Sequence, residues 1–258
     1  MPGHPVRMEL IGETNVGMKR THNEDNFSIV SEENLVIVAD GMGGHASGEV
    51  ASKMAIDAMR EFFEATAKDP DATWPYKMDK QRSYEENRLI TAVKLANLRI
   101  FEAAQREPRY RGMGTTLVVC LAVREGIIVG HVGDSRVYRI RNGTIEQLTE
   151  DHSLLNDYLK MRKLTEEEIA NFPHKNVIVR ALGMKDTVKV DTRHEQPRAG
   201  DVYLLCSDGL SGPVTDEEML EIVQSAPDLK GATSQLIQRG NENGGPDNIT
   251  VILARWAS

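Results

Sequence analysis

Aspartates stand at the ends of apolar runs at four places in this sequence. Three runs, in VIVADG, VGHVGDS and YLLCSDG, pass directly into an aspartate and then a small residue, and a fourth aspartate comes shortly before the run ITVILA. An acid at the mouth of a buried strand is unfavourable unless it is paired or bound to a cation. The candidates for such a site are Asp40, Asp134, Asp208 and Asp247.

Each of these aspartates, taken alone, has a simpler explanation, because Asp-Gly is a common turn pair. Four acids with the same relation to a strand favour convergence at one end of a sheet instead. Glycine beside the acid, as in Asp40-Gly41, lets a ligand approach and frees the backbone carbonyl. Oxygen ligands select hard cations, so we expect Mg²⁺ or Mn²⁺. Paired ions of this kind lower the pKa of bound water and hold a transferring phosphoryl group.

An arginine in the segment TNVGMKRTHNEDNF is a candidate for phosphate binding. Arg20 stands four residues before the acid pair Glu24-Asp25. A guanidinium can donate to two phosphate oxygens at once, which a lysine ammonium cannot do. The alternative is a surface salt bridge, since the pattern R-x-x-x-E-D is weak by itself.

Short apolar runs rich in β-branched residues predict the strands that carry these acids. The second and third runs are separated by V-R-E-G and predict a hairpin, and Asn142-Gly143 supplies the positive φ angles of a tight turn after the fourth. The predicted strands span residues 35–39, 116–122, 127–132, 137–140, 202–206 and 249–254.

Two long amphipathic patterns between the strands predict helices. The second helix starts at Ser83, whose hydroxyl forms a capping-box pattern with Glu86. Shorter helices are expected after Thr165 and Thr215. The first helix spans residues 49–64, with an apolar stripe made of Val50, Met54, Ala58 and Phe62.

Antiparallel-looking strands that do not alternate with helices favour an α+β fold, with stacked sheets and helices on their outer faces. The polar stretch 151–175 interrupts the strand series, and we interpret it as an inserted subdomain or lid. The chain has 258 residues, of which 40% are hydrophobic and 27% charged, so it can form a core.

The net charge of −8 excludes nucleic acid as a partner, because phosphate backbones require a basic face. No apolar stretch reaches the length of a membrane span, and the start MPGHPVRMEL lacks a signal-peptide core, so we expect a cytoplasmic protein that does not bind membranes. Cys120 and Cys206 lie in apolar runs and are expected to be small buried side chains rather than a disulfide.

Six motifs together resemble one family. TNVGMKRTHNEDNF, VADGMGGHASGEVAS, GMGTTLVV, GHVGDSRVYRI, LLCSDGLSG and GGPDNITVI occur in the order typical of the PPM family, the metal-dependent serine/threonine phosphatases of the protein phosphatase 2C type, in its compact bacterial form. The resemblance extends from about residue 10 to residue 255. It implies an α+β sandwich of two antiparallel sheets flanked by helices. We expect one catalytic domain over residues 1–258, with a flap at about 153–175.

The resemblance also implies a role for each acid. Asp40 is similar to the aspartate that bridges two metal ions, and the carbonyl of Gly41 to a ligand of one of them. Asp208 and Asp247 resemble ligands of the other ion. Asp134, with Asp208, resembles the site of a third, looser ion. The expected cofactors are therefore two Mn²⁺ or Mg²⁺ ions and a weaker third.

Four further residues complete the comparison with the family. Glu24 resembles an acid that reaches the metals through water, and Arg20 the arginine that binds phosphate. Many eukaryotic relatives have a histidine after the bridging Asp-Gly, proposed as the acid for the leaving group, whereas Met42 stands here. We expect the proton to come from water on the third ion, and His45 is the alternative donor.

The leading interpretation is an enzyme that hydrolyses phosphoserine and phosphothreonine on proteins through attack by a metal-bridged hydroxide. A catalytically silent binding module of the same fold is the alternative, but it would be expected to lose metal ligands, and all are present. A phosphatase dedicated to one bacterial regulator is a third, although such enzymes usually carry sensor domains. The expected partners are phosphorylated proteins, including a Ser/Thr protein kinase and its substrates, and we expect a monomer.

Overall fold

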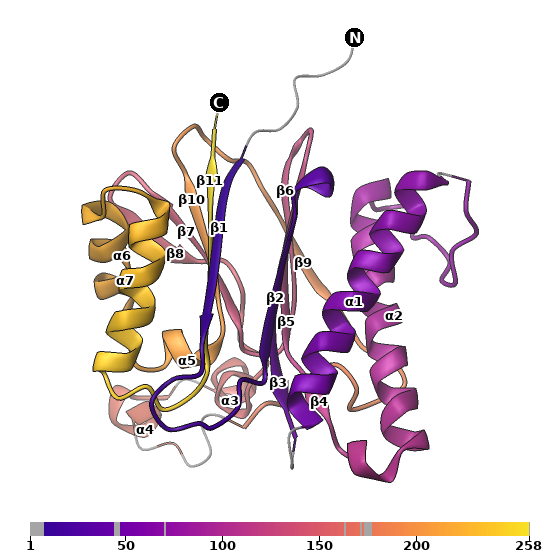
Figure 1. The fold of residues 1–258 in the computed structure, drawn as a ribbon, viewed down its shortest axis with the longest axis horizontal. Coiled ribbons are helices and arrows are strands. Elements are labelled where there is room, and N and C mark those ends of the chain that lie inside the picture. Colours follow the sequence, from indigo (N-terminus) through magenta and orange to yellow (C-terminus); the bar gives the residue numbers. More distant parts are fainter. Residues whose placement is uncertain are drawn as a thin grey trace.

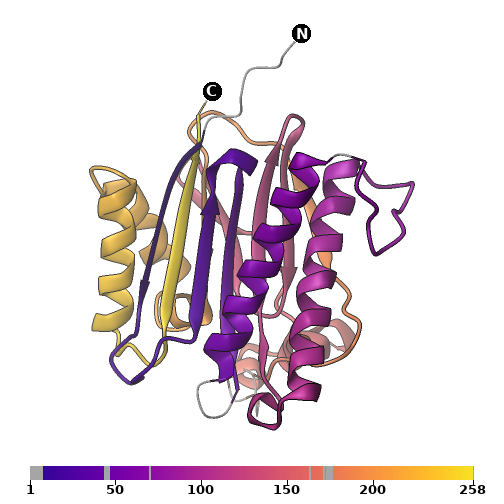
Figure 2. The same cartoon turned by 45° about the vertical axis from the view of Figure 1, so that its right-hand side comes forward.

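The computed structural model describes residues 8–43, 47–69, 71–162, 164–170, 172 and 177–257. Two β-sheets stack face to face, and helices cover the outer face of each (Figure 1). Turning the molecule brings the helices α1 (Ser47–Lys68) and α2 (Tyr84–Arg106) forward, and both run along the strands of the sheet behind them (Figure 2). The α+β class and the two-sheet sandwich predicted from the sequence are thus confirmed.

The first sheet has the strand order β1-β11-β10-β7-β8, with all pairs antiparallel. Its first and last strands in the sequence are neighbours, so the two ends of the chain meet in one sheet. The strands are β1 (Met8–Asn15), β7 (Arg136–Arg141), β8 (Thr144–Gln147), β10 (Val202–Cys206) and β11 (Ile249–Trp256).

The second sheet has the order β2-β3-β5-β6-β9, also antiparallel, and a short strand β4 pairs with the end of β3. The β5–β6 hairpin and the turn at Asn142-Gly143 are as predicted, with φ angles of 49° and 77° in the turn. The strands are β2 (Asp25–Val30), β3 (Leu35–Met42), β4 (Gly114–Thr115), β5 (Leu117–Val123), β6 (Gly126–Val132) and β9 (Asp191–Glu195).

Two long helices cover the second sheet, and two shorter ones cover the first (Figure 1). The long pair is α1 (Ser47–Lys68) and α2 (Tyr84–Arg106). The other pair is α6 (Asp216–Ser225) and α7 (Leu229–Glu242). The remaining short elements are α3 (Leu154–Met161), α4 (Glu166–Ala170), α5 (Asp208–Ser211), η1 (Ser31–Glu33) and η2 (Pro108–Tyr110).

Three apolar layers follow from the alternation of side chains along the strands. On β3, Leu35 and Ile37 pack under α1 and α2, while Val36 and Val38 point to the other sheet. On β10, Leu204 faces the shorter helices and Tyr203 faces the space between the sheets. Because both faces of the central strands are buried, these strands have continuous apolar sequences.

All six predicted strands are present, and the four missed strands of more than two residues, β1, β2, β8 and β9, are the edges of the two sheets. In the predicted stripe of the first helix, Ala58 is buried as predicted, but the other three residues are only partly buried. Val50 is only partly buried, whereas Ala51 and Ala55 are fully buried against the sheet. Small side chains allow the helix backbone to approach the strands closely, and the larger neighbours pack along the flanks of this contact.

The helix caps agree with the prediction, except that one of the two hydrogen bonds of the Ser83 capping box is not formed. Ser83 accepts from the Glu86 backbone, but the Glu86 side chain bonds to Thr192 and His194 rather than closing the box. Thr215 forms the complete box. Cys120 and Cys206 are buried and free, as expected. Within the described residues, no helix is long and apolar enough to span a membrane.

Candidate active site

The aspartates picked out in the sequence lie at one end of the sandwich. Asp40 stands near the end of β3, Asp134 follows β6, and Asp208 opens α5 directly beyond β10. Asp247 lies two residues before β11. These strand ends come together at the lower end of the molecule in Figure 1, where α5 and α3 also lie. Each sheet therefore contributes acids to the same place.

The electrostatics of Asp40 shows how close these acids are. Its side chain is partly buried, and burial raises its pKa well above the usual range for an aspartate. The carboxylates of Asp25, Asp208, Asp134 and Asp247 raise it further. The pKa of Asp208 is raised by burial and by Asp247, and a hydrogen bond shared with Asp40 partly offsets this rise. Such crowding of like charges is the situation that a bound cation relieves.

Asp25 is an acid that sequence reasoning did not assign to the site. It begins β2 directly opposite Asp40 in the strand register and is 5% exposed. Ser207 and Thr250 donate to its Oδ2 over 2.8 and 2.7 Å, from the ends of β10 and β11. Burial raises its pKa to about 7. The signal was present in the sequence, because Asp25 follows Glu24 in the motif that contains Arg20.

Asp134 faces a cavity of about 280 Å³, which it shares with Asp208 and with Ser153 and Leu155 at the start of α3. Its Oδ1 is buried and has no hydrogen-bond partner among the described residues. Burial and the nearby Asp208 raise the pKa of Asp134 to about 7. A buried carboxylate oxygen without a partner is unfavourable, and the polar cavity beside Asp134 has room for a hydrated cation.

The motif GMGTT holds the backbone of Asp40 in place. The carbonyl of Asp40 accepts from the Thr116 backbone and from the Thr115 hydroxyl, both over 2.8 Å. Thr116 Oγ1 lies 2.6 Å from Ser135 Oγ, directly after Asp134. The two threonines therefore link the strand end that bears Asp40 to the turn that bears Asp134. This gives the motif a structural reason within the site.

Gly41 occupies a position where a side chain cannot fit. A Cβ there would collide with the carbonyl oxygens of Gly48 and Glu24. The backbone N–H of Gly41 donates to the carbonyl of Glu24 over 3.1 Å. The Glu24 carboxylate accepts from the Gly48 backbone, and burial raises its pKa. Glu24 thus lies beside the Asp40-Gly41 pair.

The loop that carries Arg20 is fastened to the segment before β11. Asn248 accepts from the Glu24 backbone over 2.8 Å and donates to the carbonyls of Val16 and His22. Arg20 Nη2 contacts Asp247 Oδ2 at 2.7 Å, and about half of the arginine side chain remains exposed. The salt bridge that was the alternative explanation is therefore present. It joins Arg20 to one of the clustered acids.

The residues present fit divalent cations. The carboxylates outnumber the nearby Arg20 and Arg136, and Arg136 is engaged by Asp151 over 2.7 Å. The donors are oxygen atoms from acids, with an unpartnered oxygen on Asp134. Hard cations prefer such ligands. Met42 follows Gly41 on β3 and has no proton to donate, while His45 lies outside the described residues.

Comparisons with known proteins agree with this geometry. A sequence model of the family described as Protein phosphatase 2C matches residues 17–254. The chain is 38% identical to Serine/threonine phosphatase stp of Listeria welshimeri over 247 residues, which cover 93% of this chain and 92% of the relative. It is 38% identical to Protein phosphatase PhpP of Streptococcus pneumoniae over 249 residues, covering 95% and 96%.

A solved structure is similar over nearly the whole chain. The catalytic domain of the serine threonine protein phosphatase PstP, in complex with two manganese ions, superposes with a TM-score of 0.78 at 35% identity and covers 97% of this chain and 99% of that one. This chain therefore belongs to the protein phosphatase 2C family of metal-dependent protein-serine/threonine phosphatases.

Proposed function

We propose that this phosphatase removes phosphate from phosphoserine and phosphothreonine at the cluster of Asp40, Asp134, Asp208 and Asp247, loaded with Mn²⁺ or Mg²⁺. The observation that carries this proposal is the convergence of partly buried, mutually repelling carboxylates from both sheets around Asp40. The manganese ions of the PstP catalytic domain support divalent cations as the cofactor. The retained acids argue against a silent binding module.

Each residue has a role in this proposal. Asp40 and the carbonyl of Gly41 would hold one cation, and Asp40, Asp208 and Asp247 a second. Asp134 with Asp208 would hold a third and weaker cation at the cavity described above. When bound, such cations activate water and withdraw charge from phosphoryl oxygens.

Arg20 would bind the substrate phosphate. Its pairing with Asp247 raises the pKa of the guanidinium, so it stays a cation throughout the physiological range. The exposed part of the side chain points a charged donor to solvent at the edge of the cluster. A guanidinium there would orient a phosphate dianion and balance charge in the transition state. Glu24, at the same edge, would act through water.

The segment 153–175 would act as a flap that contacts protein substrates. Ser153 and Leu155 line the cavity beside Asp134. On α3, Tyr158, Leu159 and Met161 are exposed, and Met161 is 82% exposed. Exposed apolar side chains next to an active site are suited to recognition of a protein surface. We infer that the substrates are phosphoproteins, among them a Ser/Thr kinase and its targets, met by a monomeric enzyme.

The test is hydrolysis of phosphoserine, phosphothreonine and phosphotyrosine peptides by the purified protein, first in EDTA and then with Mn²⁺ or Mg²⁺ added. We expect no turnover in EDTA, recovery with either ion, and a preference for the first two peptides. The Asp57→Asn variant is a matched control, since Asp57 pairs with Lys53 on the surface of α1. Full turnover without added metal, or equal loss in Asp57→Asn and Asp40→Asn, would refute the proposal.

A further inference from the structure

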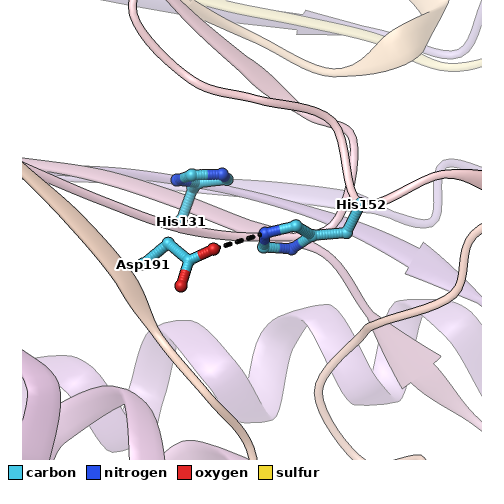
Figure 3. Close-up of side chains that lie close together, drawn as sticks. All are labelled: His131, His152 and Asp191. Carbon is cyan, nitrogen blue, oxygen red and sulfur yellow. Dashed lines mark hydrogen bonds and ion pairs between the residues drawn. The ribbon is translucent and has the colours of Figure 1, made fainter. Parts of the chain in front are cut away.

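A second polar cluster lies beside the turn that carries Asp134. It consists of His131 on β6, His152 in the loop after β8, and Asp191 at the start of β9. Figure 3 shows the two imidazole rings lying one over the other and the Asp191 carboxylate directed at His152. One ligand atom from each residue lies within 4.8 Å of the others, which is close enough for a metal site.

The contacts within the cluster argue against a metal ion. The backbone N–H of Gly133 donates to His152 Nδ1 over 3.0 Å, so the proton of the neutral ring is on Nε2. That proton is directed at Asp191 Oδ2, 3.0 Å away. Arg180 Nη1 lies 2.8 Å from the same nitrogen, and since both groups are donors, the hydrogen bond of Arg180 goes to Asp191 Oδ2. Arg180 and Lys189 also bond to Asp191, over 2.9 and 3.1 Å. A cation would therefore have to displace two positive charges that are already in place.

The cluster instead fixes the two peptide groups on either side of Gly133, in the Asp134 turn. His152 holds both polar groups of Gly133, because its ring accepts from the Gly133 N–H and its own backbone N–H donates to the Gly133 carbonyl over 2.9 Å. His131 bonds in the reverse direction, from its Nε2 to the Glu150 carbonyl over 2.9 Å. Gly133 has a φ of +109°, so this turn has an uncommon backbone conformation. Two histidines thus cross-link the end of β6 to the loop before α3.

The ring of His152 is suited to a permanent acceptor role. It is 4% exposed, and its centroid lies 4.7 Å from that of His131. Burial, together with His131 and Arg180, lowers the pKa of His152 to about 4. The ring is therefore neutral near pH 7. Because Asp191 accepts from Nε2, the ring proton stays on the nitrogen that faces away from Gly133. A neutral histidine held in this tautomer keeps accepting from the Gly133 N–H and so holds the turn in one position.

We propose that His152, oriented by Asp191, is a positioning residue that aims the carboxylate of Asp134 into the cavity where the third cation would bind. This inference rests on the proposed function. The Asp134 Oδ1 has no partner among the described residues, so the direction of this carboxylate depends on the peptide that precedes it. The backbone N–H of His152 holds that peptide through the Gly133 carbonyl, and the ring holds the peptide before it through the Gly133 N–H. Substituting a residue that orients a metal ligand commonly weakens metal affinity by about 10- to 100-fold.

Two substitutions separate the two hydrogen bonds of the His152 ring, one accepted from Gly133 and one donated to Asp191. His152→Leu removes both the acceptor for Gly133 and the donor for Asp191. His152→Asn places an amide oxygen near the position of Nδ1, so it keeps the acceptor and loses the donor. His194→Asn is the matched control, because His194, on β9, is another histidine that bonds a carboxylate, Glu86 Oε2, over 3.0 Å.

The first measurement is titration of Mn²⁺ into each metal-free protein by calorimetry. We expect His152→Leu to weaken the weakest Mn²⁺ site by about 10- to 100-fold and to leave the tighter sites unchanged. His152→Asn should lie closer to the wild type, and His194→Asn should equal it. Combining His152→Leu with Asp134→Ala should weaken binding no further than Asp134→Ala alone, since residues that act through one another are not additive.

The second measurement does not depend on metal. Long-range ¹⁵N–¹H correlation spectra of the metal-free protein report the ring tautomer, and we expect a protonated Nε2 and a bare Nδ1 for His152. The inference is overturned if Nδ1 carries the proton, or if the two substitutions have additive effects. If Asp134→Ala removes the weak Mn²⁺ site while His152→Leu retains it, the inference fails alone. If Asp134→Ala leaves the titration unchanged, the third site of the proposed function fails with it.

Discussion

Acidification should destabilise the folded, metal-free protein through His152. The folded state keeps the pKa of this ring near 4, whereas the unfolded chain has the ordinary value of 6.5. As pH falls below 6.5, the His152 ring becomes protonated in the unfolded chain, whereas in the folded protein it stays neutral until about pH 4. The free energy of unfolding must therefore decrease as pH falls through this window.

The size of the effect follows from the two pKa values. Their difference corresponds to roughly 3 kcal/mol when the ring is fully protonated in the unfolded chain only. Between pH 7.5 and pH 5 about 2 kcal/mol of this would be expressed. The charged neighbours Asp191, Arg180 and Lys189 lie at a partly open surface and are screened by solvent, so we expect about 1–2 kcal/mol.

The assay is urea denaturation in EDTA of the wild type and of His152→Asn, which does not titrate, at pH 7.5 and pH 5. Other groups titrate in both proteins, so only the difference between the two proteins is compared. The advantage of the wild type over the variant should shrink by about 1–2 kcal/mol at pH 5. A difference that is independent of pH, or that grows at pH 5, would refute the reasoning that the ring is buried as a neutral acceptor.

The other predictions concern the reaction. Asp40→Asn or Asp208→Asn should lower turnover at least about 100-fold while the protein stays folded by circular dichroism, and near-normal turnover would exclude the bridging role. Arg20→Ala should raise KM for phosphopeptide by about 10-fold or more with Mn²⁺ affinity unchanged; a collapse of Mn²⁺ affinity would mean that Arg20 organises the acids. Shortening the flap at 153–175 should lower turnover of phosphoproteins far more than of p-nitrophenyl phosphate, and equal losses would separate the flap from substrate recognition. Asp134→Ala should lose most on phosphoserine, whose leaving group needs a proton, and least on nitrophenyl phosphate, whereas equal losses would favour His45 as the donor.

The sequence predicted the central strands and missed the edges for one physical reason. Central strands such as β10 are buried on both faces and are therefore apolar throughout, as in VYLLC. Edge strands such as β1 and β9 have one side without a partner strand and contain polar residues, as in DTRHE. A search for apolar runs cannot detect them. Asp25 was missed with its strand, because β2 is also an edge.

The candidate site was easier to predict than its supports. Aspartates at the ends of apolar runs can be picked out of the sequence, and their convergence follows once the strands share a sheet end. The supports are polar residues whose partners lie far along the chain, such as Asn248 with Glu24 and His152 with Gly133. Such pairings depend on how the two sheets stack, and nothing in the local sequence of either partner records it.

The pairing of the first strand with the last has a consequence for synthesis on the ribosome. Among the described strands β1 pairs with β11 alone, and Met18 and Lys19, next to Arg20, donate to the Gly245 carbonyl. At ordinary translation rates these partners emerge roughly ten to fifty seconds after the loop that waits for them. The nascent chain thus carries Arg20, the residue proposed to bind phosphate, without its partners until the final strand is made. A chain truncated before Asp247 would lack both this partner of Arg20 and β11, the strand that pairs with β1.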